Sequence, residues 1–163
     1  MFAPPEPLTA RHALGGFDSG VPSLDEWLRR RALRNQESGA SRTFVVSDTS
    51  RVVAYYALAA SAVAPDASSG RFRRNMPDPI PVVVLARFAI ARDQQGRGVG
   101  RALFQDAASR VVQAAASIGI RGLLVHAISD GAKDFYLRLG LTPSPLEPMT
   151  LMVTVEDLKA ATR

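Results

Sequence analysis

The stretch VVVLARFAIARDQQGRGVGRALFQDAASRV, from Val82 to Val111, decides the fold of this chain. It begins with an apolar run to Ile90, passes through glycines at positions 96, 98 and 100, and continues as an amphipathic pattern. The apolar run predicts a central strand, and the apolar residues after the glycines recur at helical spacing. A strand that enters a helix through glycines directs backbone N–H groups at the positive end of the helix dipole, where proteins bind phosphate.

The composition is that of an ordinary globular protein of 163 residues, with 47% hydrophobic and 21% charged residues. This length predicts a single domain, residues 1–163. The chain has no cysteine, which excludes disulfides and thiolate chemistry, and His12 and His126 are far apart, so we expect no metal site. Neither an N-terminal leader nor an apolar run of membrane-spanning length is present, so we expect a cytoplasmic protein with no membrane association.

The formal net charge is +5, and most of the positive charge comes from arginine. The planar guanidinium group suits phosphate, so a polyanionic ligand, a cofactor or a nucleic acid is a candidate partner, although many basic proteins bind none of these. Two arginine clusters are candidate phosphate contacts, and a solvated arginine surface is the alternative for both. The first is on an expected helix (Arg29, Arg30, Arg31 and Arg34), and the second surrounds Phe72 on an expected loop (Arg71, Arg73 and Arg74).

The remaining patterns alternate between helix and strand, which predicts a mixed α/β fold. Ser23 and Glu26 have the spacing of a capping box, so we expect a helix to start there, and Thr154 with Asp157 is expected to cap a final helix. The other expected elements are a short strand from Leu8, a hairpin over 41–63, a long loop over 64–81, a buried strand over 120–128, a short helix over 129–140 closed by Gly140, and a strand over 149–155.

Three known glycine motifs compete for the turn between strand and helix. A dinucleotide-binding GxGxxG is not satisfied, because Arg101 or Leu103 replaces its third glycine when it is read from Gly96 or Gly98. A Walker A loop would need a GK[ST] ending, which is missing. QxxGxG is satisfied by residues 95–100, behind a strand and ahead of a helix. The remaining alternative is a glycine turn that only connects the two elements.

This loop resembles the pyrophosphate loop of the GNAT acetyltransferases. The resemblance covers nearly the whole chain, and the quoted segments are similar to the GNAT toxins of bacterial type II toxin–antitoxin pairs: FDSGVPSLDEWLRRRALRNQ, SRTFVV, PVVVLARFAIARDQQGRGVGRALFQDA, GIRGLLVHAISDGAKDFYLRLGLTPSP and MTLMV. It implies a mixed, mostly antiparallel central sheet flanked by helices, in which two splayed parallel strands admit the cosubstrate acetyl-CoA. It also implies an N-acetyltransferase that blocks translation by acetylating the α-amino group of aminoacyl-tRNA, a ribbon-helix-helix antitoxin and a homodimer.

Carried over to this sequence, the resemblance assigns two groups of residues to the cofactor. The backbone of Phe88, Ala89 and Ile90 would pair with the pantetheine arm. The pyrophosphate loop would consist of Gln95, Gly96, Arg97, Gly98, Val99, Gly100 and Arg101, whose two arginines either meet the adenosine phosphate or face solvent. Ser129 either bonds the pantetheine or caps the helix that follows it, and we favour the cap.

The transfer reaction needs a donor for the oxyanion and an acid for the coenzyme A thiolate. Tyr136 occupies the position of the general acid in the family, and a phenol with a pKa near about 10 is protonated at neutral pH. The alternative is a helix residue with its hydroxyl in solvent. Its neighbour Phe135 is interpreted as a core residue. A backbone N–H from the strand 88–90 would serve the oxyanion.

No histidine or carboxylate stands out as a general base, and His126 is interpreted as a hydrogen-bonded core histidine. An α-amino group, with a pKa of about 7.7 to 8.0, has a useful neutral fraction without a base, whereas a lysine amine near about 10.4 does not. The missing base therefore favours an α-amine acceptor. Arg73, Arg74 and Arg87 are candidate acceptor contacts. Because Arg87 interrupts an apolar strand, we expect it to face the acceptor cleft or an acidic partner.

Two alternative functions remain open. The first is a GNAT enzyme that acts on a small-molecule amine or a protein N-terminus. The second is a binding module without turnover, such as a DNA regulator bound to an antitoxin. The intact QxxGxG loop together with Tyr136 argues against the second.

Overall fold

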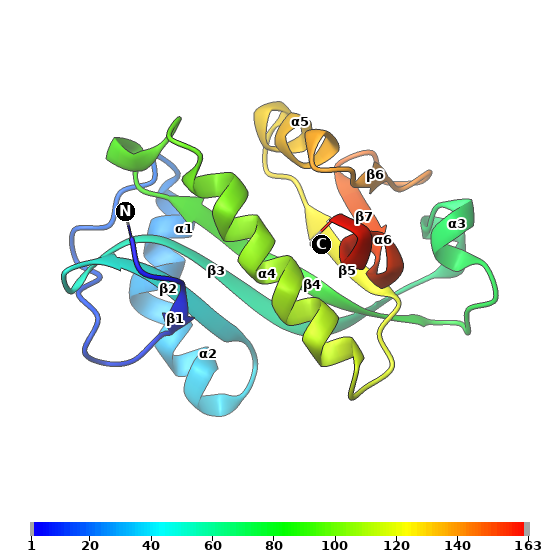
Figure 1. Cartoon of the computed structure of the whole chain (residues 1–163), viewed down its shortest axis with the longest axis horizontal. Helices are drawn as coiled ribbons and strands as arrows, with labels where there is room; N and C mark the ends of the chain where they lie inside the picture. The colour runs from blue at the N-terminus through cyan, green and yellow to red at the C-terminus, as the bar shows by residue number, and fades with distance from the viewer. Residues whose placement is uncertain (1, 162–163) are drawn as a thin grey trace. The chain divides into compact units, whose positions relative to one another are not determined.

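The computed structural model describes residues 2–161, which form a mixed sheet of seven strands: β1 (Glu6–Pro7), β2 (Arg42–Asp48), β3 (Arg51–Val63), β4 (Ile80–Ile90), β5 (Gly122–His126), β6 (Thr142–Pro143) and β7 (Thr150–Thr154). Their order in the sheet is β1-β2-β3-β4-β5-β7-β6 (Figure 1). The chain divides into two compact units. The first contains the chain up to Ala59 and Ala86–Ala107, and the second contains Ala60–Leu85 and the chain from Ala108 onward.

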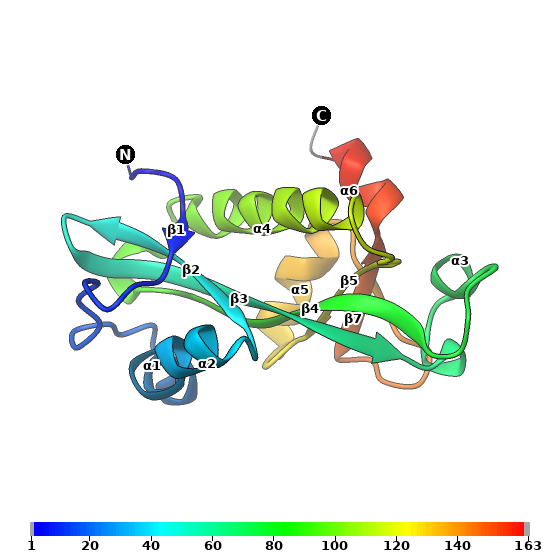
Figure 2. The ribbon, with the colours of Figure 1, turned by 90° about the horizontal axis from the view of Figure 1, so that it is seen from below.

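The first unit is built on the antiparallel strands β1, β2 and β3, which confirms the predicted hairpin. All residues from Val52 to Ala57 are buried, so both faces of β3 are covered. Three consecutive helical segments, α1 (Pro22–Trp27), a π-helical stretch (Leu28–Ala32) and α2 (Leu33–Ser38), lie on one face, and the start of α4 (Val99–Ala115) lies on the other (Figure 2).

The helix that starts at Pro22 begins differently from the prediction. Its N-cap residue is Val21, which makes no side-chain cap, so the expected capping box of Ser23 and Glu26 is wrong. Proline suits the first helical position because its fixed φ is already helical and it has no N–H to satisfy, and the helix therefore starts two residues earlier than an N-cap at Ser23 would place it. The neighbouring Asp25 turns its carboxylate back onto Ser19 instead.

The second unit contains the parallel pair of the sheet. Residues Val82–Leu85 of β4 pair parallel with Gly122–Val125 of β5, β5 pairs antiparallel with β7, and β7 pairs antiparallel with β6. The predicted central strand, second buried strand and late strand are confirmed. Their inner faces pack in one hydrophobic cluster of Phe72, Ile80, Val82, Leu124 and Met152.

Side-chain caps begin both helices that follow the strands of this unit. Ser129 Oγ accepts from the Ala132 N–H at 3.1 Å at the start of α5 (Asp130–Arg138), and Thr154 Oγ1 accepts from the Asp157 N–H at 3.1 Å in α6 (Val155–Ala161). Both predicted caps are confirmed, because serine and threonine oxygens can satisfy the open N–H groups of a first turn. Within residues 2–161, no helix has the length and apolar character needed to cross a membrane.

The segment 64–81 is not the featureless loop that its composition predicts. It contains a 3₁₀ turn (Pro65–Ala67) and a short helix, α3 (Gly70–Arg73). Phe72 is only 1% exposed and anchors α3 in the hydrophobic cluster. Arg121 fixes the end of α3, because its Nε donates to the Phe72 carbonyl at 2.8 Å and its Nη2 to the Arg71 carbonyl at 2.6 Å.

Gly122 offers a test of this packing. A Cβ at Gly122 would overlap the Val153 carbonyl oxygen and lie 2.7 Å from Phe72 Cε2. Gly122→Ala should therefore lower the free energy of unfolding by about 3 kcal/mol, as overpacking of a tight core does. Urea denaturation measures the loss. Gly119→Ala is the matched control, since a Cβ there meets nothing within 4 Å; equal stability of the two variants would contradict the close approach of β7 to β5.

Candidate active site

The glycine loop connects β4 to α4 in the first unit. A 3₁₀ turn (Arg92–Gln94) follows the strand, and Gly96 and Gly98 have φ of 76° and 81°. Both lie in the left-handed region that favours glycine. A Cβ at either position would meet nothing within 4 Å, so the backbone conformation, and not crowding, requires glycine here. Gly100 differs from them, because it lies inside the first turn of α4.

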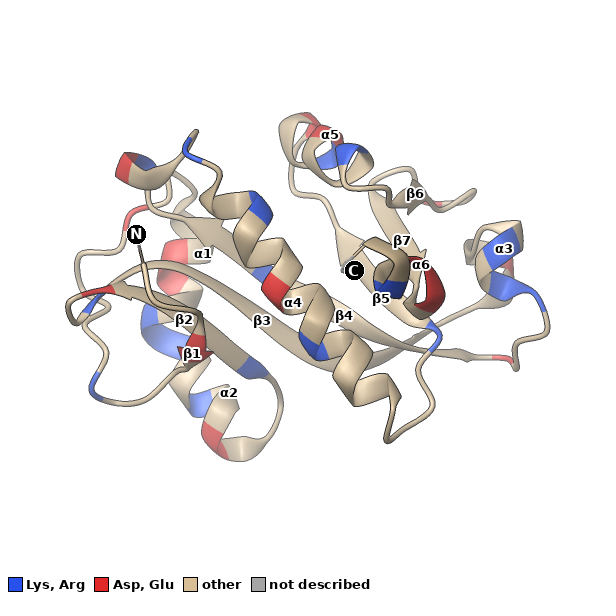
Figure 3. Ribbon diagram, in the orientation of Figure 1, with Lys and Arg blue, Asp and Glu red and all other residues tan. Residues whose placement is uncertain are grey.

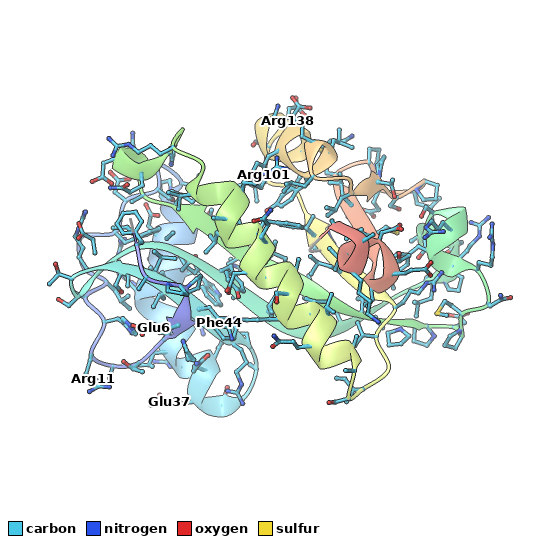
Figure 4. All side chains as sticks on the ribbon, viewed as in Figure 1. Glu6, Arg11, Glu37, Phe44, Arg101 and Arg138 are labelled. Atoms are coloured by element: carbon cyan, nitrogen blue, oxygen red, sulfur yellow. The ribbon has the colours of Figure 1, made fainter. Side chains whose placement is uncertain are left out.

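The start of α4 has the character of an anion site. The first N–H groups of an α-helix have no partner within the helix, and they lie at the positive end of its dipole. Arg97 and Arg101 are exposed beside them, and neither guanidinium forms an ion pair within the part of the chain that the structure describes (Figure 4 labels Arg101). A phosphate group is the ligand that such an arrangement suits.

The Gln95 side chain turns back into the protein. Its Nε2 donates to the Ile90 carbonyl and to the Ser19 carbonyl, each at 2.8 Å. Both amide protons are used in this way, so the Gln95 side chain joins the loop to Ser19 and to the end of β4. The donors of the loop backbone then remain available for a ligand. Ser19 is a contact of the loop that the sequence motif does not reveal.

The end of β4 contains the residues predicted to pair with a pantetheine arm. Ala89 is 5% exposed, and Phe88 and Ile90 are half-buried. After the strand, the Ala91 N–H donates to the Val53 carbonyl at 2.8 Å, which ties the exit of β4 to β3.

Tyr136 lies in the second unit, on α5. It is 5% exposed and packs edge to face against Phe135 with 5.2 Å between ring centroids. Burial raises the pKa of the Tyr136 phenol above its ordinary value, so the group stays protonated through the physiological pH range. The alternative of a hydroxyl in solvent does not fit this burial. Phe135, predicted as a core residue, is half-buried.

Two other residues of the second unit bear on the predicted site. The Ser129 hydroxyl caps α5, as favoured. His126 is exposed and its Nδ1 lies 2.8 Å from Thr150 Oγ1, so the interpretation as a core histidine is wrong. His126 is the last residue of β5, and the burial of the strand ends at Val125.

Arg87, predicted to face either the acceptor cleft or an acidic partner, has an aromatic partner within the described residues. Its Cζ lies 5.0 Å from the centroid of the Trp27 ring, and its Nη1 donates to the Ala86 carbonyl at 2.7 Å. Trp27 in turn stacks on Tyr55 with 6.0 Å between centroids and an interplanar angle of 7°. A cation over an aromatic face is stabilised by the ring quadrupole, which accounts for a half-buried charge without a carboxylate.

The two arginine clusters are partly committed to contacts within the protein. Arg71 forms a bidentate ion pair with Asp157, at 2.9 and 2.8 Å, and Arg29 donates to the Phe17 carbonyl at 3.2 Å. Arg73 donates to the Ser68 carbonyl at 3.3 Å, and Arg74 is exposed. Figure 3 shows basic residues on α3. The ion pair therefore commits Arg71, one of the three candidate phosphate contacts around Phe72, to a carboxylate within the protein.

The mixed sheet with one parallel pair, together with a glycine loop ahead of α4 whose geometry suits an anion, is typical of an α/β protein of the acyltransferase class. Residues 39–142 match the family described as "Acetyltransferase (GNAT) domain". The chain belongs to the GNAT acetyltransferase family and is an acetyltransferase, which confirms the predicted family, fold and enzyme class. No group of three or more His, Cys, Asp or Glu residues among those described could hold a metal ion.

Known relatives resemble this chain over nearly its whole length. It is 47% identical over 159 residues to the tRNA-acetylating toxin of Mycobacterium tuberculosis, which covers 98% of this chain and 96% of the relative. A solved structure of AtaT complexed with acetyl-methionyl-tRNAfMet matches with a TM-score of 0.89 and 29% identity, over 98% of both chains. A solved structure of a mutant AtaT toxin bound to the C-terminus of the antitoxin AtaR and acetyl-CoA matches with a TM-score of 0.82 and 28% identity. The match covers 96% of this chain and 95% of that chain.

The ion pair that holds α3 can be tested by pH. The Arg71 guanidinium lowers the pKa of Asp157, so the pair stabilises the folded state above the unfolded-state pKa of about 3.9, and the contribution is lost as pH falls through the folded-state pKa. Because the pair is exposed, Asp157→Asn should cost less than about 1 kcal/mol at neutral pH.

The same difference should be smaller at a pH of about 2, because the Asp157 carboxyl gains a proton and loses the ion pair as the pH falls through its lowered folded-state pKa. Urea denaturation at the two pH values measures it. Glu156→Gln is the control, since Glu156 lies 3.9 Å from Arg71 and is more exposed. A stability difference that persists in acid would show that Asp157 acts by packing and not by charge.

Proposed function

We propose that this protein transfers the acetyl group of acetyl-CoA to the α-amino group of an aminoacyl-tRNA, and that it thereby acts as a toxin that blocks translation. The observation that carries the proposal is 47% identity, over 98% of this chain, to a tRNA-acetylating toxin. An antitoxin of the ribbon-helix-helix class would neutralise it. A charged tRNA as acceptor implies action in the cytoplasm, and residues 1–163 would form one acetyltransferase domain.

The glycine loop is proposed to hold the pyrophosphate of acetyl-CoA. The N–H groups at the start of α4 would be the main donors, and the left-handed backbone at Gly96 and Gly98 lets them converge. The exposed Arg97 and Arg101 would meet the phosphates. The extended backbone of residues 88–90 would pair with the pantetheine arm, and we assign Ser129 to the cap of α5.

Tyr136 is proposed as the general acid. The amine attacks the thioester carbonyl, a tetrahedral oxyanion forms, and its collapse breaks the carbon–sulfur bond and releases coenzyme A as a thiolate. The phenol of Tyr136 would give its proton to that sulfur, and its raised pKa ensures that the proton is present. A backbone N–H of residues 88–90 would stabilise the oxyanion, and the acetylated amine loses its own proton to solvent.

The acceptor is proposed to be an α-amine on a polyanion. An α-amino group needs no strong base at neutral pH, and the exposed His126 is already hydrogen-bonded to Thr150. Arg73, at the end of α3, and Arg74, directly after it, would contact phosphates. Phe72 and Arg121 hold this short helix in place. Arg87 is proposed to contact the acceptor from its position over Trp27.

Tyr136→Phe tests the reaction directly. The change removes one hydroxyl and almost no volume, so turnover with charged tRNA should fall by roughly 10² to 10⁴ while acetyl-CoA affinity stays within a few-fold. Acetyl transfer to aminoacyl-tRNA at saturating acetyl-CoA is the measurement. Tyr56→Phe removes a phenol of the first unit that donates to Asp106, and it should leave turnover near the parent value. Full activity of Tyr136→Phe would remove Tyr136 from the mechanism, and transfer to a free amine but not to charged tRNA would refute the acceptor.

Replacement of Arg73 and Arg74 by alanine tests the RNA contact. The logarithm of the affinity for tRNA falls with the logarithm of salt concentration, and each lost phosphate contact should reduce that slope by about 0.7 to 0.9. Filter binding over a range of salt concentrations measures it. The control variant replaces Arg11 and Arg42 together by alanine, which removes the same amount of charge from the first unit. If both double variants change the slope equally, α3 contributes only net charge.

A further inference from the structure

A short turn, residues 17–20, directly precedes the helix that starts at Pro22 and is hydrogen-bonded to the glycine loop. We call it the junction turn. The Ser19 carbonyl accepts from Gln95 Nε2 at 2.8 Å, and the Asp18 carbonyl accepts from the Arg92 N–H at 2.9 Å. Asp18 Oδ1 also accepts from Arg92 Nε at 3.0 Å. The first half of the glycine loop is therefore held by backbone oxygens of the junction turn.

Asp25 fixes the junction turn from α1. Its Oδ1 accepts from the Ser19 N–H at 3.0 Å and from Ser19 Oγ at 2.5 Å, and the residue is only 6% exposed. A buried carboxylate is costly unless it is hydrogen-bonded, and short bonds from an N–H and a hydroxyl to a charged oxygen are among the stronger ones. These bonds hold Ser19, whose carbonyl accepts from Gln95 Nε2, in place.

The Ser19 carbonyl in turn determines the rotamer of Gln95. The Gln95 amide has two protons, and they bond the Ser19 and Ile90 carbonyls. Gln95 directly precedes Gly96, whose positive φ begins the part of the loop that is proposed above to present its N–H groups to pyrophosphate. The orientation of those groups thus depends on a chain of contacts that begins at Asp25.

We propose that Asp25 is a positioning residue for the cofactor loop, which acts through Ser19 and Gln95 on the N–H groups that bind pyrophosphate. The inference rests on the proposed acetyl-CoA site. Loss of the Asp25 charge and loss of its positioning contacts predict opposite effects on the affinity for acetyl-CoA. Asp25 is negative and acetyl-CoA is a polyanion, so removal of the charge by itself would tighten binding. Loss of the positioned loop weakens binding, because anion sites depend on preorganised donors.

Three variants separate the two effects. Asp25→Ala should raise the dissociation constant and the KM for acetyl-CoA by about tenfold, since a small misplacement of binding groups is costly, while kcat and the KM for charged tRNA change little. Asp25→Asn keeps an oxygen that accepts from Ser19, and it should restore most of the affinity. Glu26→Gln is the matched control: it removes a charge from the adjacent, exposed residue that pairs with Arg30, and it should change nothing.

The measurements are calorimetric titration with acetyl-CoA and the split between KM and kcat, with circular dichroism to verify folding. Parental or tighter binding by folded Asp25→Ala overturns the inference. If Asp25→Ala does not fold, Gln95→Ala decides, because it breaks the same chain of contacts at an exposed residue: weaker acetyl-CoA binding supports the inference and unchanged binding overturns it. A parent protein that does not bind acetyl-CoA would instead refute the proposed function, and this inference with it.

Discussion

The N-terminus of α4 can serve an anion only if the segment before it leaves the first N–H groups open, and this constraint shapes the first unit. The chain satisfies it with two left-handed glycines, Gly96 and Gly98, between a buried strand and a helix. Such a segment has little hydrophobic contact of its own, so it must be held from outside. The Gln95 side chain and the junction turn provide that support, and α1 is fixed to the same turn through Asp25.

Local sequence signals predicted the elements whose stability is local. The hairpin, the central strand, α4 and the caps at Ser129 and Thr154 each follow from periodicity or from a short polar motif. Two errors have local causes, namely Pro22 at the start of α1 and the position of His126 at the end of β5, and the others arise where distant residues decide the outcome. Phe72 looks like a loop residue in a segment rich in proline and arginine, and only its burial among strands that come later in the chain makes α3 an anchored helix.

The candidate site shows the same division. The QxxGxG motif identified the loop and family resemblance identified Tyr136, whose burial fits a protonated phenol. The motif does not tell where the Gln95 side chain points, and no signal near Arg87 identifies Trp27 as its partner. One feature pointed to a contact of Asp25 within the protein, because Asp25 is an acidic residue next to the buried Leu24 on α1. The contact it makes lies six residues away, across a turn, and turns of that kind are decided by tertiary packing.

The choice of arginine for the exposed basic surface has a chemical consequence of its own. An enzyme that uses acetyl-CoA carries nucleophilic side chains on its own surface, and each lysine amine there is a possible acceptor of the acetyl group. The lysines of this chain are Lys133 and Lys159, whereas the basic residues of α3 and of the stretch after Trp27 are arginines. A guanidinium remains protonated and is not a nucleophile at neutral pH. Such a surface can meet the phosphates of the proposed tRNA acceptor without itself becoming a target of acetyl transfer.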